Sequence, residues 1–129
     1  MTFDLEICYA RDDDNLARLV EALSPFHPQL RGAPAGLPFI WDVESLRRGL
    51  NFTLRTDLGD LDLFGEILGV GSFEQVRAAS LPVPLFGIEC AVLSLDGLIA
   101  AKRAAGRPKD QIILPELEAL REIAREGKD

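Results

Sequence analysis

The chain is poor in the residues that build covalent cross-links and imidazole sites. Its 129 residues include two cysteines and one histidine. Cys8 and Cys90 lie far apart, without the dense, even spacing of a secreted disulfide framework or of a zinc site. His27 stands between Pro25 and Pro28 in sequence, and no residue at a fixed spacing supports a catalytic triad. These shortages argue against a disulfide scaffold and against histidine-based catalysis, and they favour a reduced, cytoplasmic location.

Long apolar runs and an excess of positive charge are also missing. No stretch approaches the roughly 20 apolar residues of a membrane-spanning helix, and the N-terminus MTFDLEICYA lacks the order of a signal peptide. With 14 lysines and arginines against 21 acidic residues, the formal charge is -7. Such a chain repels phosphate backbones and anionic membranes unless its cations are concentrated in one place. The sequence therefore predicts no membrane partner and makes nucleic acid a poor default ligand.

What remains is the composition of an ordinary globular domain. Hydrophobic residues make up 47% and charged residues 27%, so the chain is neither disordered nor fibrous. A length of 129 residues is close to the common size of one domain. We therefore expect a single domain over residues 1–129.

Strand and helix patterns alternate along this chain. The first strand has Phe3, Leu5, Ile7 and Tyr9 on one side, which we expect to be buried. Prolines and glycines between residues 26 and 40 predict an irregular excursion. Asp57, Leu58 and Gly59 fit a tight hairpin turn between two strands. Because this hairpin makes the sheet mixed, the predicted fold class is α+β, with helices packed on a mixed sheet.

The boundaries follow from caps and turn residues. The aspartate run from Asp12 to Asp14 offers N-caps for the first helix, Asp42 is a candidate N-cap of the second, and Ser72 with Gln75 forms a capping box. Pro115 suits the first turn of the last helix. The expected strands cover residues 2–9, 52–56, 60–64 and 83–93, the last with a turn near Gly87. The expected helices cover residues 15–24, 43–48, 72–79 and 94–105, followed by a last helix of which 115–126 is the clearest part.

Two pairs of acidic residues alternate on the expected strands. Asp4 and Glu6 lie on one strand, and Asp60 and Asp62 lie on another. Residues spaced in this way project from the same face, with Cα atoms roughly 6.6 Å apart. If the two strands are neighbours, three or four carboxylates crowd one patch of the sheet. Each like-charged pair at ~5 Å then costs about 3 kcal/mol at an effective dielectric near 20.

This crowding has two interpretations. A bound divalent cation would relieve the repulsion, and ligands that are all oxygen favour magnesium or manganese over zinc. Alternatively, the acids line the wet face of an ordinary sheet, where solvent dilutes the repulsion. Arg55 lies on the strand face opposite Phe52 and Leu54, and we expect it to neutralise the acids. Cys8 shares the acidic face of its strand, where thiolate formation is disfavoured.

Positive charge gathers near the end of the penultimate helix. Lys102, Arg103, Arg107 and Lys109 fall within eight positions of an acidic protein. Lys102 continues the apolar stripe of its helix, so its stem runs along the core side and its ammonium must reach solvent or meet an anion. The simplest interpretation is a solvated helix end whose cations interact favourably with the helix dipole.

Three segments carry a family resemblance. They are Thr-Phe-Asp4-Leu-Glu6-Ile, the hairpin Asn51-Phe-Thr-Leu-Arg-Thr-Asp-Leu-Gly-Asp-Leu-Asp62-Leu-Phe, and the segment from Val92 to Asp110. Together they resemble the nucleotidyltransferase superfamily related to DNA polymerase beta, and most of all its small prokaryotic members of the abortive-infection toxin type. The resemblance follows the same order along most of the chain.

The resemblance implies transfer of a nucleoside monophosphate from a nucleoside triphosphate, with Mg²⁺ or Mn²⁺ as cofactor. It implies that Asp4 and Glu6 bind the catalytic metals and that a third carboxylate on a neighbouring strand completes the site. Asp62 best matches that third position, with Asp60 as the fallback, and Asp110 would orient a neighbouring residue. The nucleotide-binding residues implied are Lys102, Arg103 and Arg107.

The chain departs from the family pattern in two ways. Glu6 stands where the family has an aspartate, and its extra methylene shifts the ligand geometry. Family members also carry an upstream Gly-Gly or Gly-Ser turn that holds the nucleotide's phosphates, and this chain begins after that point. We therefore expect a domain that is N-terminally incomplete relative to the family. Gly69-Val-Gly71-Ser72 offers amides to an anion in principle, but the capping role of Ser72 favours a simple loop.

Two functions from different classes follow. The first is metal-dependent nucleotidyl transfer to an unknown acceptor, with the activity of this short form in question. The second is a noncatalytic module that binds a partner protein or another copy, as in a toxin and antitoxin pair. An exposed apolar strand edge would then be covered by another chain, because an open edge invites pairing.

Overall fold

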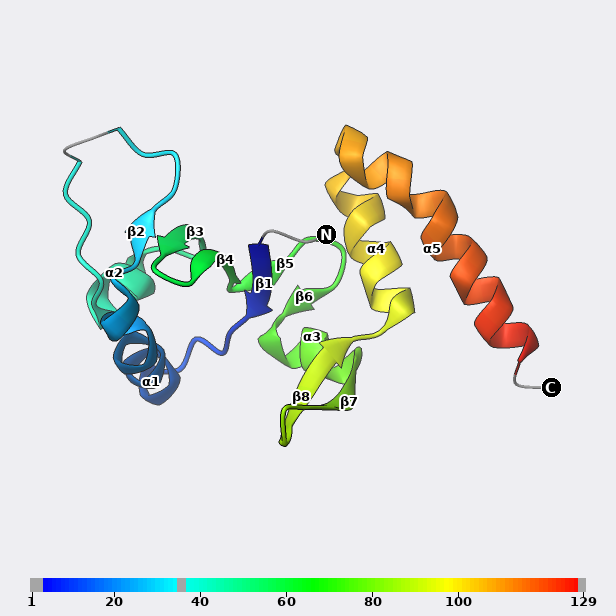
Figure 1. Ribbon diagram of the computed structural model, residues 1–129, viewed down its shortest axis with the longest axis horizontal. Helices are drawn as coiled ribbons and strands as arrows, with labels where there is room; N and C mark the ends of the chain where they lie inside the picture. Colours follow the sequence, from blue (N-terminus) through cyan, green and yellow to red (C-terminus); the bar gives the residue numbers. More distant parts are fainter. Residues whose placement is uncertain (1–3, 35–36, 128–129) are drawn as a thin grey trace. The chain divides into compact units, whose positions relative to one another are not determined.

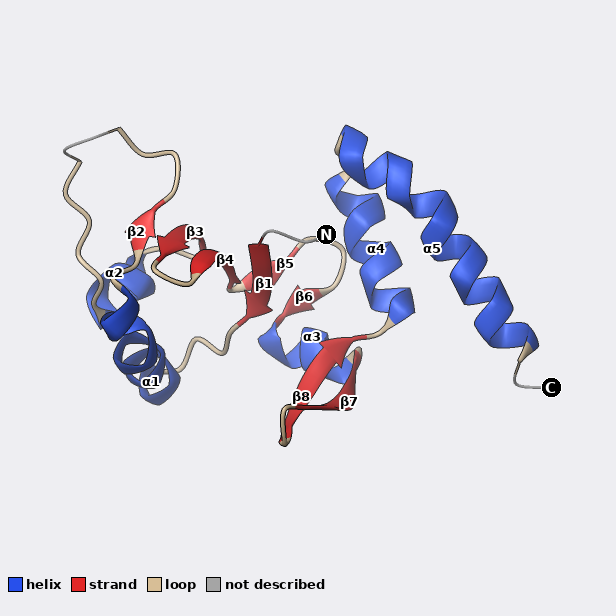
Figure 2. Ribbon diagram, viewed as in Figure 1, coloured by secondary structure: helices blue, strands red, loops and turns tan. Residues whose placement is uncertain are grey.

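The computed structural model describes residues 4–34 and 37–127, with the backbone alone for Asp4. The chain divides into two compact units, Met1–Glu66 and Ile67–Asp129, and each is described by itself. Helices and strands occur in both units (Figure 1, Figure 2). The main sheet contains parallel and antiparallel pairs, which confirms the predicted α+β class with a mixed sheet. The expectation of a single domain stays a prediction.

A four-stranded sheet forms the base of the first unit, in the order β1-β4-β3-β2. β1 (Asp4–Cys8) runs parallel to β4 (Gly59–Phe64), and β4 is antiparallel to β3 (Asn51–Thr56). The hairpin between β3 and β4 has the tight turn that the sequence predicts, and Gly59 adopts the positive φ of +124° there. Within the described part of the chain, β1 is therefore an edge strand.

The proline-rich excursion contributes a strand that its composition does not reveal. β2 (Gln29–Leu30) pairs antiparallel with β3, and the backbone N–H of Arg31 then donates to the Thr53 carbonyl at 2.9 Å. The existing strand β3 supplies partners for these backbone groups, so a short segment can join the sheet without a local strand signal. This pairing brings Arg31 to the edge of the sheet.

Two helices cover one face of this sheet. α1 (Asp13–Leu23) begins after Asp12, whose carboxylate accepts a backbone hydrogen bond at 3.1 Å, and a 3-10 turn, η1 (Ser24–Phe26), follows it. α2 (Val43–Arg48) begins after Asp42, whose carboxylate accepts a backbone hydrogen bond at 2.8 Å. Asp42 is confirmed as an N-cap, and of the run from Asp12 to Asp14 the cap is Asp12, so α1 begins two residues before the expected Asn15. Each cap satisfies an amide that the helix itself leaves without a partner.

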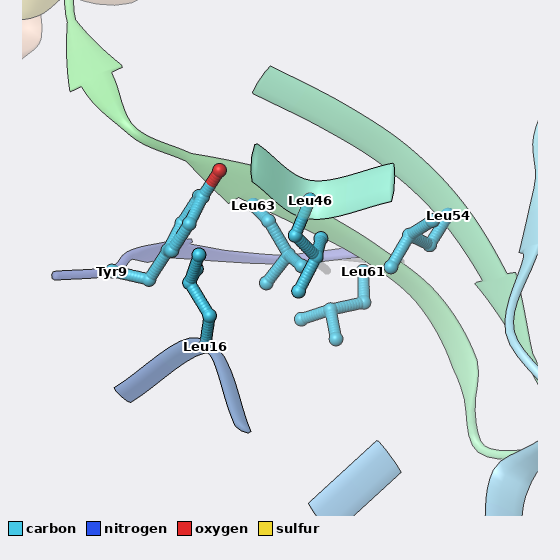
Figure 3. Close-up of a cluster of buried hydrophobic side chains, with 6 residues drawn as sticks. All are labelled: Tyr9, Leu16, Leu46, Leu54, Leu61 and Leu63. Atoms are coloured by element: carbon cyan, nitrogen blue, oxygen red, sulfur yellow. The ribbon is translucent and has the colours of Figure 1, made fainter. Parts of the chain in front are cut away.

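The core of the first unit lies between these helices and the sheet (Figure 3). Leu61 and Leu63 point into it from β4, and they alternate with Asp60 and Asp62, which therefore project from the opposite face. The two faces of β4 thus separate the core from a polar surface. The buried cluster consists of Tyr9, Leu16, Leu46, Leu54, Leu61 and Leu63.

The apolar side of β1 is less covered than the sequence predicts. Tyr9, just after the strand, is 3% exposed, but Leu5 is 61% and Ile7 is 37% exposed. β1 lies at the edge of the sheet, and in the part of the chain that the structure describes its strand partner is β4 alone. Phe3, the other residue of this side, lies outside the described residues.

The second unit contains short strands followed by a helical hairpin. The Ser72 N–H donates to the Gln75 side chain at 2.9 Å, which confirms the predicted capping box. Among the residues described, no helix is long and apolar enough to cross a membrane. β5 (Glu66–Ile67) begins at the last residue of the first unit. The elements that follow are β6 (Gly71–Ser72), α3 (Phe73–Ala78), β7 (Ser80–Leu85), β8 (Ile88–Leu93), α4 (Leu95–Ala105) and α5 (Pro108–Glu126).

Pro115 lies inside α5, so its predicted first-turn position is wrong. The first turn instead contains Pro108, which follows the cap residue Arg107. Pro108 costs little there, because the first amides of a helix have no partner within it. Pro115 lacks the N–H that would bond the preceding turn. The helix nevertheless continues to Glu126, in contact with α4.

The core of the first unit gives a stability prediction. Leu63 is 0% exposed, so Leu63→Ala leaves a cavity and should lower the free energy of unfolding by about 2–5 kcal/mol. Leu58 is 76% exposed, and Leu58→Ala should change it by less than about 0.5 kcal/mol. Urea unfolding followed by circular dichroism measures both. Equal effects of the two variants would contradict the assigned core.

Candidate functional site

The polar face of the main sheet brings the acidic residues of β1 and β4 side by side. In the parallel register, Asp4 pairs with Asp60 and Glu6 pairs with Asp62. Paired residues on neighbouring strands project from the same face, with backbones about 4.8 Å apart. The condition set by the sequence, that the two acidic strands be neighbours, is therefore met. We call this group the carboxylate face.

Exposure differs across the carboxylate face. Glu6 is exposed at the sheet edge. The Asp60 side chain is 39% exposed, whereas that of Asp62 is 11% exposed. A carboxylate as covered as that of Asp62 needs hydrogen-bond donors or a cation, because burying an unpaired charge is costly.

Arg31 provides that cation, and the sequence reasoning missed it. Its Nη2 donates to Asp62 Oδ1 at 2.7 Å, and its Nη1 lies 3.6 Å from Asp60 Oδ2. Nη1 also donates to the Leu54 carbonyl at 3.1 Å. One signal in the sequence does point to it, because Arg31 is the one arginine or lysine between Arg18 and Arg47.

Arg55 lies on the face where we expected it to neutralise the acids, but it is not paired with the acids that the structure describes there. It is exposed on β3, where its Cα pairs with that of Asp60. It makes no ion pair with any residue that the structure describes. Its charge therefore lies on the carboxylate face, but the ion pairs there come from Arg31.

The donor chemistry of the carboxylate face fits an oxygen-preferring cation. Glu6, Asp60 and Asp62 offer carboxylate oxygens, which suit Mg²⁺ or Mn²⁺. Asp4 joins them by backbone register, although its side chain is not described. Among the side chains that the structure does describe, no three of His, Cys, Asp or Glu are grouped closely enough to hold a metal ion.

Cys8 completes the polar side of β1. Burial raises the pKa of its thiol, and a backbone hydrogen bond from Tyr9 offsets this in part. Burial therefore disfavours the thiolate, whereas the expected cause was the neighbouring acids.

The predicted nucleotide-binding residues gather around two acids in the second unit. Asp110, 1% exposed, accepts from Arg107 Nε at 2.7 Å and from the Arg107 backbone N–H at 3.1 Å. Lys102 Nζ lies 3.6 Å from Asp110 Oδ1. Arg103 contacts Glu118 at 2.6 Å, which ties α4 to α5. We call the group of Lys102, Arg107 and Asp110 the helix-turn cluster.

The helix-turn cluster fixes the connection between α4 and α5. Hydrogen bonds from Arg107 lower the pKa of Asp110 to about 2, with the charge of Lys102 as a smaller cause. Gly106 ends α4 with a φ of +62°, a left-handed conformation that glycine adopts without strain. Asp110 therefore contacts two cations at the turn.

The glycine segment before α3 is a packed loop. The backbone N–H of Ser72 already donates a hydrogen bond to the Gln75 side chain in the capping box. Gly69 has a φ of +89°, and a Cβ there would lie 2.6 Å from the Ala100 carbonyl oxygen. The glycine thus serves close packing on α4, and the interpretation of this segment as a simple loop is favoured.

Comparisons with known proteins add no relative. The chain matches no protein-family model, and comparison with curated proteins and with solved structures finds no match either. A functional proposal therefore depends on the carboxylate face of the first unit and the helix-turn cluster of the second.

The low pKa of Asp110 gives a pH prediction. The folded value of about 2 is below the unfolded value of about 3.9. The stabilisation from Asp110 is therefore complete above roughly pH 4 and is lost as the pH falls towards 2. Thermal unfolding followed by helical circular dichroism should show Asp110→Asn less stable than wild type at pH 6, with the difference shrinking between pH 4 and 2.

Glu118→Gln is the control for this measurement. It also removes a carboxylate that pairs with an arginine between the two helices, but Glu118 is 42% exposed. Exposed pairs contribute little, so its effect should be small at every pH. A constant gap between wild type and Asp110→Asn from pH 6 to pH 2 would contradict the assigned pairing.

Proposed function

We propose that the protein is a metal-dependent nucleotidyltransferase-like protein that transfers a nucleoside monophosphate from a nucleoside triphosphate to an acceptor. The observation that carries the proposal is the parallel register of β1 and β4, which pairs Asp4 with Asp60 and Glu6 with Asp62. This is the arrangement of carboxylates that the family resemblance implies. Asp4, Glu6 and Asp62 are the proposed metal ligands, with Asp60 as the alternative third ligand.

Each group has a distinct role in this proposal. The bound Mg²⁺ or Mn²⁺ would supply charge stabilisation for the phosphoryl group and the leaving pyrophosphate. The carboxylates would hold the metal, and one of them would accept the proton of the acceptor hydroxyl. Lys102, Arg103 and Arg107 are the proposed contacts for the triphosphate. Asp110 supports such a role, because it holds Lys102 and Arg107 at one turn.

The metal site makes a prediction that needs no substrate. Ligand binding to the native state alone, at ten times the Kd, stabilises it by about 1.4 kcal/mol. Millimolar Mn²⁺ or Mg²⁺ should therefore raise the Tm by roughly 5 °C. Asp4→Ala and Asp62→Asn should each abolish this shift, because each removes a proposed ligand.

Differential scanning fluorimetry measures these shifts, with Glu21→Gln as the matched control. Glu21 is an exposed acid of α1, away from the carboxylate face, so its variant should keep the full shift. The metal-site proposal fails if wild type shows no metal-dependent shift, or if all variants shift alike.

The nucleotide site makes a second prediction. Lys102 is the proposed triphosphate contact, and a hydrogen bond to a charged group contributes about 1.5–3 kcal/mol. Lys102→Ala should therefore weaken binding of a non-hydrolysable nucleoside triphosphate, in the presence of Mg²⁺, by roughly 10- to 100-fold. Lys109→Ala removes the same charge from an exposed position in the next helix and should change the Kd less than threefold. Isothermal titration calorimetry measures both, and equal losses would indicate only a general charge effect.

A second candidate function rests on β1. Leu5 is 61% and Ile7 is 37% exposed on an edge strand. Such an edge invites pairing with another chain, so this observation supports a noncatalytic module that binds a partner protein or a second copy. The metal experiment separates the two candidates, because a purely noncatalytic module has no reason to bind Mn²⁺ through Asp62.

A further inference from the structure

Arg31 is attached to the sheet by its backbone and reaches across it with its side chain. Its backbone N–H donates to the Thr53 carbonyl at 2.9 Å, which fixes it beside β3. Its Nη1 donates to the Leu54 carbonyl at 3.1 Å, so the side chain passes over β3. The guanidinium thus arrives at the carboxylates of β4 from the side opposite β1, since β1 and β3 flank β4 in the sheet.

The contact of Arg31 with Asp62 is closer than its contact with Asp60. Nη2 lies 2.7 Å from Asp62 Oδ1, whereas Nη1 lies 3.6 Å from Asp60 Oδ2. The side chains of Arg31 and Asp62 are 28% and 11% exposed, so the pair is better shielded from solvent than an ordinary surface salt bridge. A charge-assisted hydrogen bond of this length occupies an oxygen that a metal ion would need.

We propose that Arg31 is the internal cation of the carboxylate face and that a divalent metal binds there by displacing its guanidinium from Asp62. This inference rests on the proposed metal site and adds a competitor to it. The guanidinium and the metal are both cations that repel each other and compete for the negative charge of Asp62, so each weakens the binding of the other. Arg31 therefore stabilises the carboxylates in the absence of metal and lowers the affinity of the site for metal.

The chain offers a matched control in Arg55. It carries the same charge on the same face of the sheet, with its Cα paired to that of Asp60. It makes no ion pair with the residues that the structure describes. Arg55→Gln thus changes the net charge as Arg31→Gln does, but leaves the Asp62 contact in place. A difference in metal affinity between the two variants therefore reports the Arg31–Asp62 contact and not the loss of one positive charge.

The experiment is titration of the full chain with Mn²⁺ alone, followed by electron paramagnetic resonance of free Mn²⁺. Arg31→Gln should bind Mn²⁺ about tenfold more tightly than wild type, equivalent to ~1.4 kcal/mol. Arg55→Gln should change the affinity by less than threefold. Arg31→Lys keeps the charge but loses the forked geometry, so it should fall between wild type and Arg31→Gln. It also gives a readout if Arg31→Gln does not fold.

The remaining outcomes are distinguishable. If wild type binds Mn²⁺ but neither Arg31 variant binds it more tightly, the competition is overturned and the metal site stands. Equal gains in Arg31→Gln and Arg55→Gln also overturn it, because general charge then explains the change. If neither wild type nor any folded variant binds Mn²⁺, the proposed metal site itself fails, and the competition fails with it.

Discussion

The parallel pairing of β1 with β4 is the constraint on which the first unit depends. In its register Ile7 pairs with Leu63, and Glu6 pairs with Asp62. Because strand side chains alternate between faces, a slip of one residue would place acids of one strand beside leucines of the other. Burial of Leu61 and Leu63 against the helices therefore fixes the position of Asp60 and Asp62. The core thus decides the face of the β4 carboxylates, and the register with β1 places Glu6 beside Asp62.

The two most covered carboxylates of the described chain are neutralised in different ways. Asp110 accepts from Arg107, three positions earlier, within the first turn of α5. Asp62 accepts from Arg31, at a sequence separation of 31. The first pair forms wherever the helix forms, so it belongs to the fold. The second requires a loop to dock on the sheet, and such a contact can be exchanged for another cation without unfolding a helix.

Most of the structural features that the sequence predicted correctly depend on residues close to one another in the chain. The caps Asp12 and Asp42, the box of Ser72 and Gln75, and the hairpin turn all act within a few residues, and all are present. The failures are of two kinds. The start of α5 was missed although its signals are local, because Pro108 rather than Pro115 occupies the first turn. The other failures are tertiary: β2 exists because β3 offers it a partner. Arg31 is the clearest case, because a remote ion pair leaves no periodic trace in sequence.

The two candidate functions use opposite sides of the same strand. Leu5 and Ile7 lie on the apolar side of β1, whereas Glu6 shares the carboxylate face with Asp62. A partner that covered the apolar side would leave the carboxylates accessible from the other face. It would also stiffen β1, whose carboxylates must keep their register with β4 for any shared metal. Partner binding and metal binding are therefore compatible in one molecule, and a partner at this edge would favour the metal site instead of replacing it.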